Sequence, residues 1–217
     1  MEIAYTLTTW ILPLLLVVIL HEVAHGYIAL KLGDRTALTM GRLTLDPRKH
    51  IDPVGSILIP GILLLSGSKF LFGWAKPVPI DTRRFAHPKR DMGIVAASGP
   101  LMNVALAVVF AAVLKLVMLL PAGSVVLWAG QNLVNGVQLS LILAVFNLFP
   151  ILPLDGGRVL LSLLPPKYAY HYAQSEKYGF LILFGVLFIL PMAGLDIFGW
   201  FAGVLYPLFL SIVGLVM

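Results

Sequence analysis

Long apolar stretches follow one another along this chain and constrain its fold more than any other feature. They lie at about residues 7–31, 54–67, 92–120, 124–150, 178–194 and 197–217. Several of them reach the roughly 20 apolar residues that a helix needs to cross the hydrocarbon core of a bilayer. Because 59% of the residues are hydrophobic and the mean hydropathy is +0.97, a soluble globular domain is excluded. The sequence predicts an all-α polytopic membrane protein embedded in a lipid bilayer.

The chain is expected to form one integral-membrane domain over residues 1–217, with a core at 7–165 and a C-terminal helical pair at 178–217. The first apolar run has no basic region before it and no small-residue cleavage site after it. It should therefore persist as a span rather than act as a removable signal peptide. The absence of cysteine excludes disulfides and thiolate metal sites, which leaves His, Asp and Glu as the strong ligands.

Basic residues are unevenly placed and predict the orientation of the chain. Eleven of the fifteen Lys and Arg residues lie between Lys31 and Arg90, and three more lie between the fourth and fifth apolar runs. Since positive residues concentrate in cytoplasmic connections, both connections are expected in the cytoplasm and the N-terminus outside. This placement accounts for the excess of five positive charges without a nucleic-acid partner.

The second apolar run, at 54–67, is expected to enter the membrane without crossing it. It holds only about 14 residues and is interrupted by Pro60 and Gly61, which is short for a span. A full crossing would also place the basic residues that follow it on the opposite side from Arg42 and Arg48. A re-entrant hairpin at the cytoplasmic side gives five crossings, and a sixth crossing stays open.

Two further segments of this connection do not have a helical pattern. Residues 36–45 are rich in Thr and Leu around Gly41, which favours a short β-hairpin or bulged strand. Residues 69–80 carry aromatics and then Pro77 and Pro79, so they should be extended, with Trp74 near the membrane interface. Both segments can be surface loops, or they can pair with an unwound substrate segment by strand addition.

A pair of histidines stands inside the first apolar run, in the sequence HEVAH. His21 and His25 are four apart, so both imidazoles project from one face of a helix and can bind one zinc ion. Glu22 lies about 100° round the helix, where it can act as general base toward a water at the metal. Counted from Leu7, His21 lies roughly 21 Å along the helix, inside the bilayer toward its cytoplasmic side. Because ionisable groups are costly inside a membrane unless they are paired or used, metal binding is favoured over buried structural histidines.

A catalytic zinc site normally has three protein ligands and one open position, so a third ligand is needed. The fourth run ends in NLFPILPLDGG, in which Asp155 is the one acid. Taken alone, Asp155 fits a helix cap before residues 156–164 equally well, and the missing ligand favours the metal. The proline-broken backbone around it implies a cavity, because non-helical backbone at membrane depth must face protein or water. Asn147 stands just before this stretch, where its amide can donate to a developing oxyanion or simply end the helix.

Other polar residues in the apolar runs have mainly structural interpretations. In SGPLMN, Gly99 should allow close helix packing, and Asn103 can line the site or bond a neighbouring helix. Gln131, Asn135 and Gln138 form a polar stripe that should face the bundle interior, with a substrate or water path as the alternative. The remaining histidines lie in polar connections and are expected to face solvent: His50, His87 and His171.

With HEVAH, SGPLMN and NLFPILPLDGG in this order, the chain resembles the site-2 protease family of intramembrane metallopeptidases, peptidase family M50. The resemblance extends through DRTALTMGRLTLDPRKHIDPVGSILIP and FGWAKPVPID and covers most of residues 10–165, as in a compact prokaryotic branch without a peptide-binding or nucleotide-sensing module. It implies one zinc ion per chain at His21, His25 and Asp155, with Glu22 as catalytic base and acid and Asn147 close to the reacting carbonyl. It also implies regulated cleavage within the transmembrane segment of a substrate protein.

The sequence therefore predicts a zinc-dependent intramembrane endopeptidase in a prokaryotic cell membrane, with its active site toward the cytoplasm. A membrane divalent-metal transporter is the first alternative, but it needs a chain of ligands across the bilayer and the sequence holds one cluster. A catalytically silent membrane scaffold is the second alternative. Two imidazoles and a carboxylate would also accept divalent ions other than zinc.

Overall fold

The computed structural model describes residues 2–66 and 73–214, and within these ranges the chain is helical and forms no β-strand. Five helical segments are long and apolar enough to cross a membrane, which agrees with the predicted five to six. They are Ala4–Lys31, Pro88–Val117, Ser124–Asn147, Pro166–Met192 and Ile197–Gly214. The prediction of an all-α, multi-pass membrane protein is confirmed at this level.

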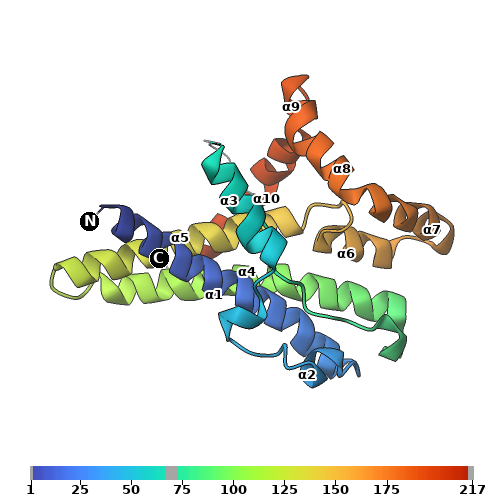
Figure 1. The fold of residues 1–217 in the computed structure, drawn as a ribbon, viewed down its shortest axis with the longest axis horizontal. Helices are drawn as coiled ribbons and strands as arrows, with labels where there is room; N and C mark the ends of the chain where they lie inside the picture. Colours follow the sequence, from blue (N-terminus) through green and yellow to red (C-terminus); the bar gives the residue numbers. More distant parts are fainter. Residues whose placement is uncertain (1, 67–72, 215–217) are drawn as a thin grey trace.

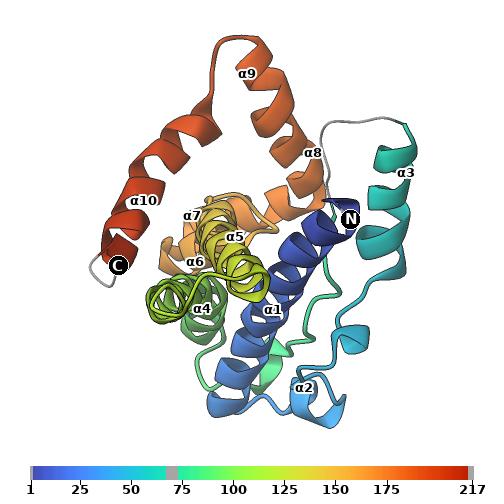
Figure 2. The same cartoon turned by 90° about the vertical axis from the view of Figure 1, so that its left-hand side faces the viewer.

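Three long helices form the centre of the molecule: α1 (Glu2–Lys31), α4 (Pro88–Val117) and α5 (Ser124–Asn147). They lie side by side in Figures 1 and 2, and the largest core cluster joins them around Val17, Phe110 and Leu141. A Cβ atom added at Gly136 of α5 would lie only 2.8 Å from the ring of Phe110 on α4. Small residues at such contacts let helix backbones approach each other, which stabilises helix pairs in lipid through close packing.

Shorter elements connect and flank the central helices. Before α4 these are α2 (Thr36–Thr39), a 3₁₀ turn at Pro47–Lys49, a π-helical segment at Pro53–Leu58 that continues into α3 (Ile59–Leu65), and a 3₁₀ turn at Thr82–Arg84. After α5 they are α6 (Asp155–Leu163), α7 (Pro166–Gln174), a 3₁₀ turn at Ser175–Tyr178, α8 (Gly179–Phe184), a π-helical segment at Gly185–Ile189, α9 (Leu190–Met192) and α10 (Ile197–Gly214). In Figure 2, α8 and α9 extend away from the central helices, and α10 returns so that Val213 near its C-terminal end joins the core cluster. Most of the apolar surface of these helices is not covered by protein.

The polar stripe predicted on the fourth apolar run faces the bundle interior only in part. Asn135 is 1% exposed, and its Nδ2 donates to the carbonyl of Thr9 on α1 at 2.8 Å. The Gln131 amide nitrogen donates to Asn135 Oδ1 at 2.9 Å from the edge of the bundle. Gln131 and Gln138 are both exposed, so the prediction is wrong for these two residues. The polar atoms of the stripe tie α5 to α1.

The β-hairpin or bulged strand predicted at 36–45 is wrong. Residues Thr36–Thr39 form the single helical turn α2, which ends shortly before Gly41 with its φ of +62°. The turn begins where the fully buried carboxylate of Asp34 accepts the backbone N–H of Thr36 at 2.9 Å. A side-chain acceptor at this place satisfies a free N–H of the first helical turn, which a Thr-rich pattern does not reveal.

Residues 73–80, by contrast, have the predicted extended conformation. Residues 74, 76 and 78 donate their backbone N–H groups to one side, at N···O distances of 3.1, 2.9 and 2.8 Å. The acceptors are the carbonyls of Gly55 and His50 and the carboxylate of Glu22. Donation by every second residue is the periodicity of a strand-like backbone. The rest of the predicted extended segment, residues 69–72, lies outside the described residues.

The end of this segment is fixed to the end of α1. The backbone N–H of Asp81 donates to the second carboxylate oxygen of Asp34 at 2.7 Å. Hydrogen bonding from the neighbouring Arg83 guanidinium lowers the pKa of the Asp81 side chain to about 2. The Asp81 carboxylate therefore stays charged next to Arg83. The segment 73–81 is therefore tethered along its whole length.

The same packing overturns the expectation that His50 faces solvent. His50 is only 3% exposed, and its Nε2–H donates to the Thr44 carbonyl at 2.9 Å. The segment 73–81 covers it, because the Lys76 N–H bonds to its backbone carbonyl. His87 and His171 are exposed, as expected.

Candidate metal centre

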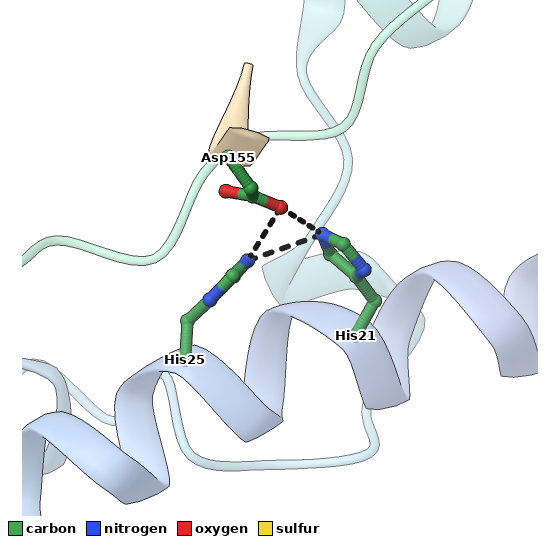
Figure 3. A group of neighbouring side chains, drawn as sticks. All are labelled: His21, His25 and Asp155. Carbon is green, nitrogen blue, oxygen red and sulfur yellow. Dashed lines mark hydrogen bonds and ion pairs between the residues drawn. The ribbon is translucent and has the colours of Figure 1, made fainter. Parts of the chain in front are cut away.

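Two imidazoles and one carboxylate meet between α1 and the start of α6 (Figure 3). The Nε2 atoms of His21 and His25 lie 3.1 Å apart. Asp155 Oδ2 lies 3.2 Å from the first and 3.3 Å from the second. Both histidines are buried, with 6% and 7% of their surface exposed. The structure thus brings together the three side chains that the sequence predicted as ligands.

The geometry of this cluster fits a tetrahedral zinc ion. With zinc–ligand bonds of about 2.0–2.2 Å, the ligand atoms of a tetrahedral site lie about 3.3–3.6 Å apart. The three observed separations of 3.1, 3.2 and 3.3 Å are close to that value. Asp155 Oδ2 is also buried and has no hydrogen-bond partner in the described parts of the chain, which is costly for a carboxylate oxygen unless a cation binds it. The residues present therefore fit the ion.

The two histidines differ in what holds their outer nitrogens. His25 Nδ1–H donates to the Val95 carbonyl of α4 at 2.8 Å, and the Ser98 hydroxyl lies 3.4 Å from the same nitrogen. This bond fixes the tautomer that leaves Nε2 free to face a metal. Nδ1 of His21 is buried and has no hydrogen-bond partner among the described residues. The orientation of the His25 imidazole is thus fixed by a hydrogen bond, whereas that of His21 is not.

Gly99 of α4 packs directly against both imidazoles. A Cβ atom at this position would lie 2.4 Å from His25 Nε2 and 2.5 Å from His21 Cε1. The close packing expected for Gly99 is therefore present. Its contact with the metal centre was not foreseen, because SGPLMN by itself does not show which helix it meets.

Asp155 is the first residue of α6, and its side chain does not cap that helix. The alternative interpretation as a helix cap is wrong, because the carboxylate faces the histidines instead. The two glycines that follow Asp155 allow the backbone of residues 148–152 to pack closely against the start of α6. A Cβ atom at Gly156 would lie 2.1 Å from the Leu148 carbonyl oxygen, and one at Gly157 would lie 2.5 Å from the backbone nitrogen of Leu152. Only glycines at these positions allow the turn that carries Asp155 into the site.

A pocket of about 660 Å³ opens over the cluster and contains both predicted catalytic residues. Glu22 lines it, with its Oε2 accepting the backbone N–H of Val78 at 2.8 Å. Asn147, the last residue of α5, also lines it, and its Nδ2 donates to the Leu143 carbonyl at 3.0 Å. Val78 was not predicted, and no sequence signal identifies it, because its contribution is a backbone group.

The chain matches the model of peptidase family M50 over residues 123–192, which include Asp155. It is 43% identical over 178 residues to "Putative zinc metalloprotease YwhC" of Bacillus subtilis, a match that covers 80% of this chain and 76% of that protein. It is 35% identical over 190 residues to Rip2 of Mycobacterium tuberculosis, which has the same designation, covering 88% of this chain and 68% of that protein. No solved structure matches the chain. These matches confirm the resemblance stated from the motifs: the chain belongs to peptidase family M50 and is a zinc metalloprotease.

Proposed function

We propose that this zinc metalloprotease cleaves peptide bonds within the transmembrane segments of other membrane proteins. The observation that carries the proposal is the position of the ligand cluster. His21 and His25 stand on a helix that is long and apolar enough to span a membrane, and the ligand atoms of the cluster lie within 4.8 Å of one another. A substrate that reaches Asp155 and these histidines must therefore do so at membrane depth. The family membership favours this enzyme over a metal transporter or a silent scaffold.

His21, His25 and Asp155 hold the zinc ion in this proposal, and Glu22 and Asn147 act on the substrate. When bound, zinc supplies a Lewis acid that acidifies water and polarises a peptide carbonyl. Glu22 takes a proton from the attacking water and returns it to the leaving amine nitrogen. The amide of Asn147 turns from its bond with the Leu143 carbonyl to donate to the carbonyl oxygen as negative charge develops there.

The extended segment 73–80 is suited to hold an unwound substrate beside the ligands. Its inward edge is occupied by the bonds of residues 74, 76 and 78, so the outward edge consists of residues 75, 77 and 79. Two of these are prolines and lack an N–H, which leaves Ala75 as the donor. A transmembrane helix hides its carbonyls in hydrogen bonds, so pairing at this edge would stabilise the locally unwound form that cleavage requires.

We place the active site toward the cytoplasm of a prokaryotic cell, following the basic connections at 31–90 and 158–177. The helix of Pro53–Leu65 is too short to count among the candidate spans. In this topology it re-enters the side from which it came, which gives five crossings with the N-terminus outside.

The replacement Glu22→Gln tests the proposed chemistry. It removes the proton acceptor but no metal ligand, so cleavage of a membrane-spanning test substrate in proteoliposomes should fall by roughly 10²-fold or more while zinc content is unchanged. A zinc chelator should abolish cleavage by the parent chain. Unchanged cleavage by Glu22→Gln contradicts the mechanism, and zinc uptake into liposomes that survives this change would favour the transporter.

The bond from the Val78 N–H to Glu22 is tested by Val78→Pro. Proline removes the donor but suits an extended segment that already has Pro77 and Pro79 on either side. We expect lower kcat with zinc content unchanged, because the Glu22 carboxylate loses its fixed orientation. Val78→Ala is the matched control, since it shortens the same side chain and keeps the N–H. Equal kcat values for the two variants would show that the bond does not orient Glu22.

The space at Gly99 is tested by Gly99→Ala. The added methyl group would overlap both imidazoles, so the purified variant should bind far less than one zinc ion per chain by elemental analysis. Gly203→Ala on α10 is the control, because a Cβ atom there meets nothing within 4 Å, and it should keep full zinc content. Full zinc occupancy in Gly99→Ala would refute the proposed ligand geometry.

The topology can be mapped with single cysteines, because the native chain has none. Arg48→Cys and Lys177→Cys should react with a membrane-impermeant maleimide in inverted vesicles, whereas Ala193→Cys should react in intact spheroplasts; all three positions are exposed. The cysteine-free parent gives the background. Labelling of Arg48→Cys and Lys177→Cys from opposite sides would rule out the five-crossing arrangement.

A further inference from the structure

We propose that Asn103 is a positioning residue of the metal centre. One buried water accepts the Nδ1–H of His21 and donates to the Asn103 amide oxygen, and this bridge holds the imidazole with Nε2 toward the metal. The inference rests on the proposed ligand role of His21, and it assigns to α4 the support of both histidines.

The first observation is the unpartnered nitrogen of His21. A histidine that binds a metal through Nε2 carries its hydrogen on Nδ1, and this N–H normally donates to an outer partner. His25 has such a partner in the Val95 carbonyl, at 2.8 Å. His21 Nδ1 is also buried but has no such partner within residues 2–66 and 73–214. A buried donor without an acceptor is costly, so an acceptor is needed at this place.

The second observation is the side chain of Asn103. It is 0% exposed, and neither Oδ1 nor Nδ2 has a hydrogen-bond partner among the described residues. A primary amide can donate two hydrogen bonds and accept two. All of these hydrogen bonds of Asn103 remain available in an apolar interior. A buried asparagine needs hydrogen-bond partners, and the amide of Asn103 still lacks them.

The third observation is the register of α4 along α1. Asn103 follows Gly99 by four residues, so it projects from nearly the same face of α4, one turn further along. Gly99 itself abuts the imidazole of His21 at Cε1, the ring carbon bonded to Nδ1. The helices run antiparallel here, because α4 meets His25 at Val95 and the core cluster around Val17 further on. Asn103 lies one turn beyond Gly99 in the direction of Val17. Because helical side chains lean toward the N-terminus of their own helix, the side chains of His21 and Asn103 on these antiparallel helices lean toward each other.

Ser140 on α5 is the competing partner. Its hydroxyl is also fully buried and makes no hydrogen bond to any residue that the structure describes, and α5 packs against both α1 and α4. Buried waters typically satisfy several such polar groups at once. If Asn103 served Ser140 alone, it would join α4 to α5 and would not affect the metal. The two assignments therefore differ in zinc affinity, which can be measured without a substrate.

The experiment compares three variants of the full chain in detergent, using a chromophoric chelator to determine the zinc Kd. Asn103→Leu removes the amide at similar size, Asn103→Asp keeps an acceptor, and Ser140→Ala removes the competing hydroxyl. We expect Asn103→Leu to weaken zinc binding by roughly 10- to 100-fold, which is the usual effect of losing an outer-shell partner. Asn103→Asp should restore most of the affinity, and Ser140→Ala should leave it unchanged. Parent-like affinity in Asn103→Leu, or equal losses in Asn103→Leu and Asn103→Asp, overturns the proposal.

A second measurement decides the question if Asn103→Leu does not fold. In imidazole nitrogen NMR spectra, Asn103→Asp should move the Nδ1 resonance of His21 and leave that of His25, which is held by Val95, in place. A His21 resonance that does not move, or one that moves together with His25, overturns the proposal. The proposed cleavage can fail separately, because neither zinc affinity nor these spectra depend on a substrate. If the parent chain binds no zinc, the proposed function fails, and the metal-free spectra still test Asn103.

Discussion

Two imidazoles and a carboxylate share a small buried volume inside a bundle that is otherwise apolar, and the rest of the structure depends on this arrangement. Ionisable groups at such a depth are unfavourable unless a counter-charge or a cation is present. The separations between His21, His25 and Asp155 match the edges of a zinc tetrahedron, so one cation can offset the cost of all three. The cluster joins the first helix of the chain to a turn more than a hundred residues later.

The central helices serve this cluster in different ways. Helix α1 supplies both histidines of the cluster and the proposed base Glu22 from one and a half turns, and α4 contributes space and a backbone carbonyl. Gly99 gives the imidazoles room, and the Val95 carbonyl fixes the tautomer of His25. Helix α5 ends at Asn147, and the glycine-rich turn after it places Asp155. The metal centre thus depends on close helix packing as much as on the ligands.

The connection after α1 belongs to the active site rather than to the surface alone. Asp34 holds the end of the segment 73–81, and Glu22 accepts a hydrogen bond from its middle. Any movement of this segment must therefore change the surroundings of the Glu22 carboxylate. Helices α8 to α10, in contrast, bury little of their surface in the protein. The closely packed part of the molecule therefore surrounds the candidate metal ligands, and α8 to α10 leave most of their apolar surface uncovered.

The sequence by itself predicted five candidate spans with a sixth left open, the shared face of His21 and His25, and Asp155 as the side chain that meets them. These predictions follow from local rules. Hydropathy identifies a span, helical periodicity shows which residues share a helix face, and the absence of cysteine leaves His, Asp and Glu as the strong metal ligands. It did not determine the helical turn at 36–39 or the burial of His50. The turn depends on the carboxylate of Asp34, and the burial of His50 depends on the segment 73–81, which packs over it from elsewhere in the chain. Only the tertiary structure revealed Gly99 against the imidazoles and the Val78 N–H on Glu22. The physical reason is that these contacts join separate helices or use backbone groups, and neither a helix neighbour nor a backbone N–H leaves a mark in the local pattern of residues.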